Sequence, residues 1–183
     1  MAAIAREEAP HLSTILLLCM VVGVAMPRTA LADDGWPKHT QHLFDIERSV
    51  NANIVQYDAV LNEDGSLDKD NPVIGYWIRK AEDGRRKQLN MLERKLAYGF
   101  KTRVLDNGSV LMDMAADIRR MVRVEKVADR WVAITRIDGH SAYIVRIYVS
   151  LEDDKPLPKV QYVDLYGSDV ANGERVHERY FKH

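Results

Sequence analysis

The stretch RWVAITRIDGHSAYIVRIYVS, residues 130–150, decides the fold class of this chain of 183 residues. Both halves of the stretch are rich in β-branched and aromatic residues, which favour strands. Between them, Asp138-Gly139 is a pair that tolerates the positive φ angles of a two-residue hairpin turn. The stretch therefore predicts two antiparallel strands, in which Ile137 lies opposite His140.

This pairing also separates two faces of the predicted hairpin. One face pairs Ile134 with Tyr143 and Val132 with Val145, and we interpret it as a core face. The opposite face is semi-polar, because it mixes charged, polar and apolar residues. Its members are Trp131, Ala133, Thr135, Ile137, His140, Ala142, Ile144 and Arg146. Such a mixture either lines a ligand cavity or faces solvent.

Turn signals and period-two patterns predict eight more strands along the chain. They cover residues 43–49, 52–61, 73–80, 99–105, 109–115, 118–127, 159–166 and 174–181. Asn107-Gly108 is a second two-residue hairpin signal. We therefore expect a mainly β protein, an antiparallel β-barrel or sandwich of about nine to ten strands with a lipocalin-like or calycin-like outline.

One segment, residues 85–98, departs from the strand pattern. It has no β-branched residue, its leucines recur at positions 89, 92 and 96, and Gly99 stands at the place of a helix C-cap. These features predict one amphipathic α-helix, inserted after the third strand. The helix would carry a basic stripe made of Lys87, Met91, Arg94 and Tyr98. That stripe suits an anionic ligand or a lipid head group, or is simply a solvated face.

The first 32 residues are predicted to be a cleaved signal peptide. Residues 15–26 form an apolar run of 12 residues, and Ala30 and Ala32 occupy the two positions that a signal peptidase reads. The run is too short to remain as a transmembrane anchor. We expect export to the periplasm or the exterior, a polar leader at residues 33–42, and a single β-rich domain at residues 43–183. The only cysteine, Cys19, would leave with the signal peptide, so no disulfide is expected.

Charge and motifs exclude several classes of function. The 26 Lys and Arg residues nearly balance the 27 Asp and Glu residues, which argues against nucleic-acid binding. No glycine-rich phosphate-binding motif occurs in the sequence. His39, His42 and Asp45 have a spacing that suits zinc, but they begin the mature chain, and we interpret them as tail residues. We therefore expect neither a metal nor another cofactor.

The segment that leads into the predicted strand at residues 52–61 combines a guanidinium, two amides and a phenol. These groups belong to Arg48, Asn51, Asn53 and Tyr57. Together they suit an anionic or polyhydroxylated ligand. In the alternative interpretation, the asparagines satisfy backbone groups at a bulge, and Arg48 pairs with Glu47 or Asp45.

Four stretches of the mature chain also carry a family resemblance. They are LFDIERS at residues 43–49 with Asn51, Asn53, Tyr57 and Asp58; Pro72-Val73 with Tyr76-Trp77; ERKLAYGF at residues 93–100; and PLPKV at residues 156–160 with Tyr162 and Gly167. As a set they resemble the domain of unknown function 4833 family over nearly the whole mature chain. The resemblance implies no activity and no catalytic residue. It does draw attention to residues 48–57 and to Trp77, Arg94, Lys95 and Tyr98.

The leading hypothesis is an exported β-barrel module that binds a small anionic or amphiphilic ligand. We place its pocket at Arg48, Asn51, Asn53, Tyr57, Trp77, Tyr98 and Arg146. Two alternatives stay open. One is an enzyme that uses His140, Tyr143 or Tyr148 as an acid or base beside an arginine. The other is an envelope domain that contacts a protein partner through its surface. The sequence favours a binding protein over an enzyme.

Overall fold

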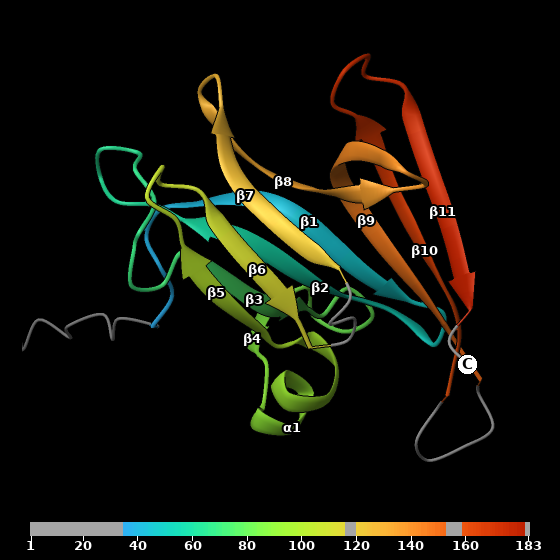
Figure 1. Ribbon diagram of the computed structural model, residues 1–183. Coiled ribbons are helices and arrows are strands. Elements are labelled where there is room, and N and C mark those ends of the chain that lie inside the picture. Colours follow the sequence, from blue (N-terminus) through green and yellow to red (C-terminus); the bar gives the residue numbers. More distant parts are fainter. Residues whose placement is uncertain (1–34, 116–119, 153–158, 182–183) are drawn as a thin grey trace, which may run out of the picture. The chain divides into compact units, whose positions relative to one another are not determined.

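The computed structural model describes residues 35–115, 120–152 and 159–181 (Figure 1). The predicted signal peptide and its cleavage site lie outside the described residues. Within them, the chain is mainly β, as predicted, but it has eleven strands rather than nine or ten. The strands are β1 (Thr40–Arg48), β2 (Asn51–Val60), β3 (Val73–Ile78), β4 (Arg86–Gln88), β5 (Phe100–Val104), β6 (Val110–Met114), β7 (Met121–Val127), β8 (Arg130–Ile137), β9 (His140–Leu151), β10 (Val160–Asp169) and β11 (Arg175–Phe181). The helical elements are α1 (Met91–Glu93) and η1 (Arg94–Tyr98).

Strand β9 is the place where the sheet divides. Its first residues, His140 to Tyr143, pair antiparallel with β8, whereas Arg146 to Val149 pair in parallel with β1. Its other edge pairs with β10, which in turn pairs with β11. The result is one curled sheet, a half-barrel in outline, with the arms β1-β2-β3-β4 and β8-β7-β6-β5 on either side of the fork (Figure 1).

The core lies between the two arms. Phe44 of β1 stacks on Tyr57 of β2 at 4.7 Å between ring centroids, and Tyr57 meets the ring of Phe100 of β5 edge-on at 5.8 Å. Met112 and Ile137 close the core from β6 and β8, and both are fully buried. Packing of this kind, with aromatic rings from both arms, supplies the main stabilising free energy of such a fold.

The two predicted hairpins form, and their turns differ. Asp138 and Gly139 both have positive φ, at 49° and 81°, and Ile137 pairs with His140 as predicted. In the second hairpin only Gly108 has positive φ, and the amide of Leu105 donates to the carbonyl oxygen of Ser109 at 2.8 Å. This turn is therefore a three-residue loop with a glycine bulge, not the two-residue turn that was predicted.

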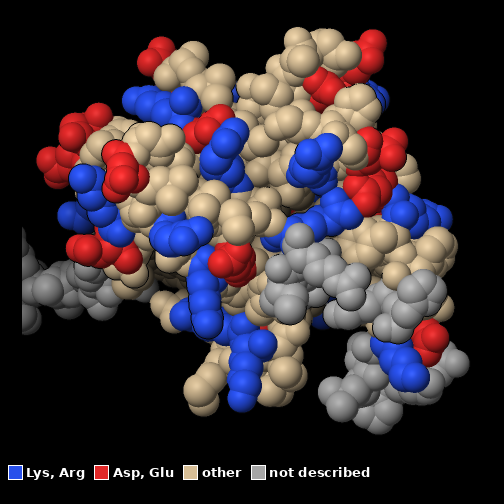
Figure 2. Space-filling model, viewed as in Figure 1, with Lys and Arg blue, Asp and Glu red and all other residues tan. Residues whose placement is uncertain are grey.

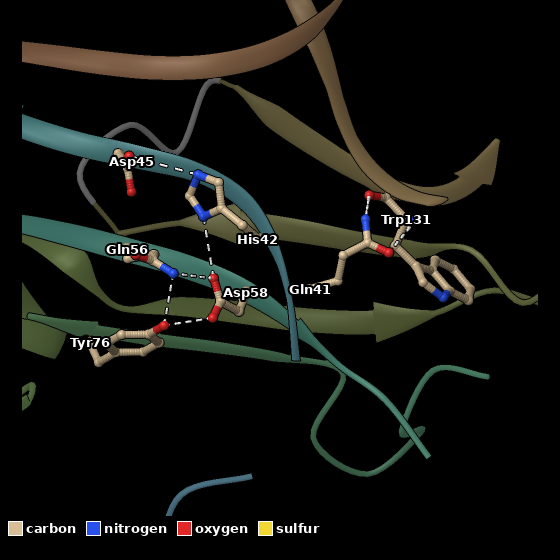
Figure 3. Close-up of polar contacts among 7 residues, drawn as sticks. All are labelled: Gln41, His42, Asp45, Gln56, Asp58, Tyr76 and Trp131. Atoms are coloured by element: carbon tan, nitrogen blue, oxygen red, sulfur yellow. Dashed lines mark hydrogen bonds and ion pairs between the residues drawn. The ribbon is translucent and has the colours of Figure 1, made fainter. Parts of the chain in front are cut away.

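The interpretation of the faces of the β8–β9 hairpin is wrong. Trp131, Ile137 and Ala142 of the semi-polar face are buried in the core, whereas on the opposite face Ile134 is buried but Val145 is exposed. The cause is distant in sequence, because these residues belong to the same core cluster as Leu43, Phe44 and Ile46 of β1. The Gln41 side chain of β1 donates to the carbonyl oxygen of Trp131 at 2.6 Å and accepts from its amide at 3.1 Å, so it replaces a backbone ladder (Figure 3).

The prediction of a helix over residues 85–98 is wrong for the first half of this segment. Arg86–Gln88 form β4 against β3, so the helix follows the fourth strand and begins at Met91. Asn90 and Glu93 determine this start, because each side chain accepts a hydrogen bond from the other residue's amide. None of the helices in the described residues is long and apolar enough to cross a bilayer.

Gly99 ends this helical segment for another reason than the one predicted. Its φ is −75°, which any residue adopts, so it is not a left-handed C-cap. A Cβ atom at this position would collide with the carbonyl oxygen of Arg94. The close approach of two backbone segments therefore requires glycine here.

Candidate functional site

Arg48 lies at the end of β1, beyond the core residues Phe44 and Ile46. Its guanidinium carbon is 4.5 Å from the ring centroid of Trp77 and 6.0 Å from that of Tyr98. The two rings meet edge-on at 5.1 Å. No carboxylate pairs with Arg48 within the described residues, and its buried Nε atom has no hydrogen-bond partner there. We call Arg48, Trp77 and Tyr98 the arginine cluster.

The two asparagines of the predicted pocket mainly hold the backbone. Asn51 accepts a hydrogen bond from the amide of Asn53 at 3.0 Å and one from Arg48 at 3.4 Å. Asn53 accepts from the amide of Ala81 at 2.9 Å. Asn51 therefore adjoins the arginine cluster, whereas Asn53 ties the start of β2 to the loop after β3.

The predicted pocket also included Tyr57 and Arg146, and the side chains of both lie outside the arginine cluster. Tyr57 is fully buried in the core, its hydroxyl donates to the carbonyl oxygen of Tyr98 at 2.8 Å, and burial raises the pKa of its phenol well above the ordinary value. Arg146 lies on the opposite face of the sheet, where it pairs with Glu47 at 3.3 Å and covers the ring of Tyr166 at 4.2 Å. The alternative interpretation paired Arg48 with Glu47 or Asp45. Within the described residues Glu47 pairs with Arg146 instead, and no ion pair joins Arg48 to either carboxylate.

A second polar cluster lies on the face of β1, β2 and β3 that points away from the core (Figure 3). At its centre is Asp58, a carboxylate that is only 2% exposed. It accepts hydrogen bonds from the Tyr76 hydroxyl at 2.6 Å, from Gln56 Nε2 at 2.8 Å and from His42 Nδ1 at 3.3 Å. We call these four residues the aspartate network.

The electrostatics of the aspartate network favour charge on both Asp58 and His42. Burial alone would raise the pKa of Asp58, but the hydrogen bonds from His42, Tyr76 and Gln56 hold it below its ordinary value. The hydrogen bond to Asp58 raises the pKa of His42 above its ordinary value, against the effect of burial. Burial and the hydrogen bond to Asp58 raise the pKa of Tyr76, so its hydroxyl remains a donor.

A register shift between His42 and Phe44 explains why sequence reasoning missed the aspartate network. In an unbroken strand His42 and Asp45 would point to opposite faces. The shift instead buries both Leu43 and Phe44 in the core and brings His42 Nε2 to 3.7 Å from Asp45 Oδ2. Burial raises the pKa of Asp45, and its Oδ1 atom has no hydrogen-bond partner among the residues that the structure describes. The described residues contain no group of three or more acidic, histidine or cysteine side chains arranged to hold a metal ion.

Next to His42, the fork between β1 and β8 leaves a hollow of about 400 Å³. It is lined by His42, Leu43, Val127, Arg130, Trp131, Val132, Ala133, Tyr143, Ile144 and Val145. A volume of this size accommodates a small organic molecule. The hollow places a histidine and a tyrosine beside an arginine. The histidine is His42, which we interpreted from the sequence as a tail residue, but it lies in β1.

A third cluster ties β10 to β11 and explains two further polar residues. Asp164 accepts two hydrogen bonds from Arg179, at 2.7 and 2.8 Å, and contacts His177 Nε2 at 3.0 Å. The bonds from Arg179 lower the pKa of Asp164 to about 2. His140, an acid or base candidate from the sequence, contacts the carboxylate of Asp169 at 2.7 Å.

Comparison with known proteins gives a family and no activity. Residues 44–179 match the family described as Domain of unknown function (DUF4833). No curated protein and no solved structure matches the chain.

Proposed function

The chain belongs to the DUF4833 family, and because that description assigns no function, we propose one from the geometry: an exported module that binds a small anionic ligand at the arginine cluster. The observation that carries the proposal is the state of Arg48. Its guanidinium stacks on Trp77 and Tyr98, has no carboxylate partner within the described residues, and keeps a buried Nε atom without a hydrogen-bond partner.

A partly buried cation without a carboxylate partner is costly, and an anion that reaches it removes that cost. A carboxylate or a phosphate group accepts two parallel hydrogen bonds from a guanidinium. Trp77 is buried, so it holds Arg48 in place rather than stacking on a ligand. Tyr98 is only partly buried and lies within reach of an apolar part of the ligand. This arrangement supports an anionic head group as the recognised element.

Native mass spectrometry of the protein purified after export tests for a retained small molecule. Titration with inorganic phosphate and with dodecanoate, followed by calorimetry, then measures the affinity for two defined anions. Arg48→Gln should weaken binding by roughly 10-fold to 100-fold, because a hydrogen bond to a charged group contributes about 1.5–3 kcal/mol. Arg86→Gln is the matched control, since Arg86 also stacks on an aromatic ring, that of Tyr76 at 5.0 Å. Equal affinity of wild type and Arg48→Gln would refute the site.

The hollow beside His42 favours a second candidate function, acid–base catalysis. The buried Asp58 orients His42 through Nδ1, as a carboxylate does for a catalytic histidine, and Tyr143 and Arg130 line the same hollow. A screen with chromogenic esters and phosphoesters tests it. Turnover that is lost in His42→Gln and kept in His140→Gln would support catalysis; turnover equal in both variants would exclude His42.

A further inference from the structure

The helical segment of residues 89–98 presents three neighbouring apolar side chains to solvent. Met91 is 84% exposed, Leu92 is 64% exposed and Leu96 is 62% exposed. Single exposed apolar residues are common, but three on adjoining helical turns form a patch, and such patches mark surfaces of interaction. We call Met91, Leu92 and Leu96 the apolar tip.

The apolar tip is held rigidly on the domain. The reciprocal hydrogen bonds of Asn90 and Glu93 fix the first turn. Leu89 is buried in the core, and its carbonyl oxygen accepts a hydrogen bond from Arg94 Nε at 3.0 Å. At the other end, the Tyr57 hydroxyl binds the carbonyl oxygen of Tyr98. The exposure of the three side chains is therefore a property of a fixed element anchored at both ends.

Positive charge surrounds the apolar tip. Residues 85–103 contain seven Lys and Arg residues and one acidic residue, Glu93, whereas the whole chain has a formal charge of −1. Lys87, Lys95 and Lys101 are exposed and form no ion pair within the described residues. In Figure 2, basic and uncharged side chains dominate the lower end of the domain, where α1 lies in Figure 1.

From this combination we propose that the apolar tip docks the domain onto an anionic lipid membrane. Met91, Leu92 and Leu96 enter the boundary between head groups and acyl chains, and the surrounding lysines contact the anionic head groups. A second copy of the chain is a poorer occupant, because a symmetric contact would bring the two basic rims together. The proposal does not depend on the ligand site, since Arg48 takes no part in it.

A fluorescent dye attached to the apolar tip reports whether this position, and no other part of the chain, enters the membrane. Cys19 is the single cysteine, so Leu92→Cys in a Cys19→Ser background places an environment-sensitive dye at one position of the full chain. The same dye at Val145→Cys is the control, because Val145 is similarly exposed, at 58%, on β9. The probes are vesicles of phosphatidylcholine with phosphatidylglycerol, and vesicles of phosphatidylcholine alone.

The dye at position 92 should shift to shorter wavelength only with the anionic vesicles, and the dye at position 145 should not shift. Lys95→Gln should reduce the partition coefficient onto the anionic vesicles roughly fivefold, and about 1 M salt should abolish most of the shift. Lys69→Gln, on the exposed loop before β3, is the matched charge control and should bind as wild type does. A dye at position 92 that stays in water with anionic vesicles would overturn the proposal. A shift that appears without vesicles and grows with protein concentration would also overturn it, in favour of self-association.

Discussion

Replacing Asp58 by Asn should destabilise the fold and lower the pKa of His42 together. Asp58 is nearly inaccessible to solvent and accepts two short hydrogen bonds, from Tyr76 and Gln56. Asn keeps one acceptor oxygen but turns an NH₂ group toward one of these donors. Hydrogen bonds to a charged group contribute about 1.5–3 kcal/mol each, so we expect a loss of about 2–4 kcal/mol in the free energy of unfolding.

The effect on His42 follows from the hydrogen bond that raises its pKa. In the wild type, the folded state binds the His42 proton more tightly than the unfolded state. This contribution to stability is present in full below the unfolded pKa of 6.5 and is lost as pH rises through the higher folded pKa. In Asp58→Asn, the main cause of the raised pKa is absent, so the His42 titration should move to lower pH and this loss of stability should shrink.

Two measurements check the prediction. Proton NMR of the histidine rings gives the pKa of His42, whose signal among the six histidines is identified with His42→Gln. Urea unfolding at several pH values gives the free energies. Asp113→Asn is the matched control, because Asp113 is an exposed strand aspartate, and it should change stability by no more than about 0.5 kcal/mol. If the His42 titration in Asp58→Asn coincides with that of the wild type, Asp58 does not set the protonation of His42.

Three further predictions concern single residues. Asp164, with its pKa at about 2, stabilises the fold above pH 3.8 and loses that contribution as pH falls toward 2. The free energy of unfolding, measured with urea, should therefore fall by about 1 kcal/mol over this window, a figure reduced because Arg179 is partly exposed and its charge is screened. Gly99→Ala should lower the free energy of unfolding by about 1–3 kcal/mol, because the added Cβ collides with the carbonyl oxygen of Arg94. If urea unfolding gives a smaller decrease, the backbone shifts to relieve the collision and glycine is not required here. Ala128→Gly should raise stability by about 0.5 kcal/mol, since Ala128 holds a φ of 52°; a lower melting temperature would contradict this.

Local features of the fold were predictable from the sequence, and long-range ones were not. Asp138-Gly139 determines its own turn, so both the hairpin and its register followed from the residues alone. The face that this hairpin buries depends on β1, which lies about 90 residues earlier and reaches Trp131 through Gln41. No local pattern contains that information. The helix is an intermediate case, because the capping pair Asn90 and Glu93 was present in the sequence and fixes the start at Met91.

The candidate site divides in the same way. Residue type and the family resemblance selected Arg48, Trp77 and Tyr98, and the structure brings these three side chains together. Their contact depends on the register of β1, β2 and β3 and on the return of the chain through η1. Arg146 was selected by residue type as well, but the register shift between Ile144 and Arg146, where β9 pairs with β10, places it on the other face. A residue type indicates what a side chain can bind, whereas its face follows from the pairing of strands that are distant in sequence.

The two register shifts of β1 connect the fold with both candidate functions. One lies between His42 and Phe44, beside the histidine that contacts Asp58, and the other lies between Ile46 and Arg48, beside the guanidinium that stacks on Trp77. A bulge interrupts the ladder and redirects a side chain, at the expense of regular pairing. A strand that served only to fill the core would gain stability from an unbroken ladder. Because one irregularity adjoins His42, which contacts Asp58, and the other adjoins Arg48, which stacks on Trp77, we infer that β1 is shaped to present His42 and Arg48 as much as to bury Phe44 and Ile46.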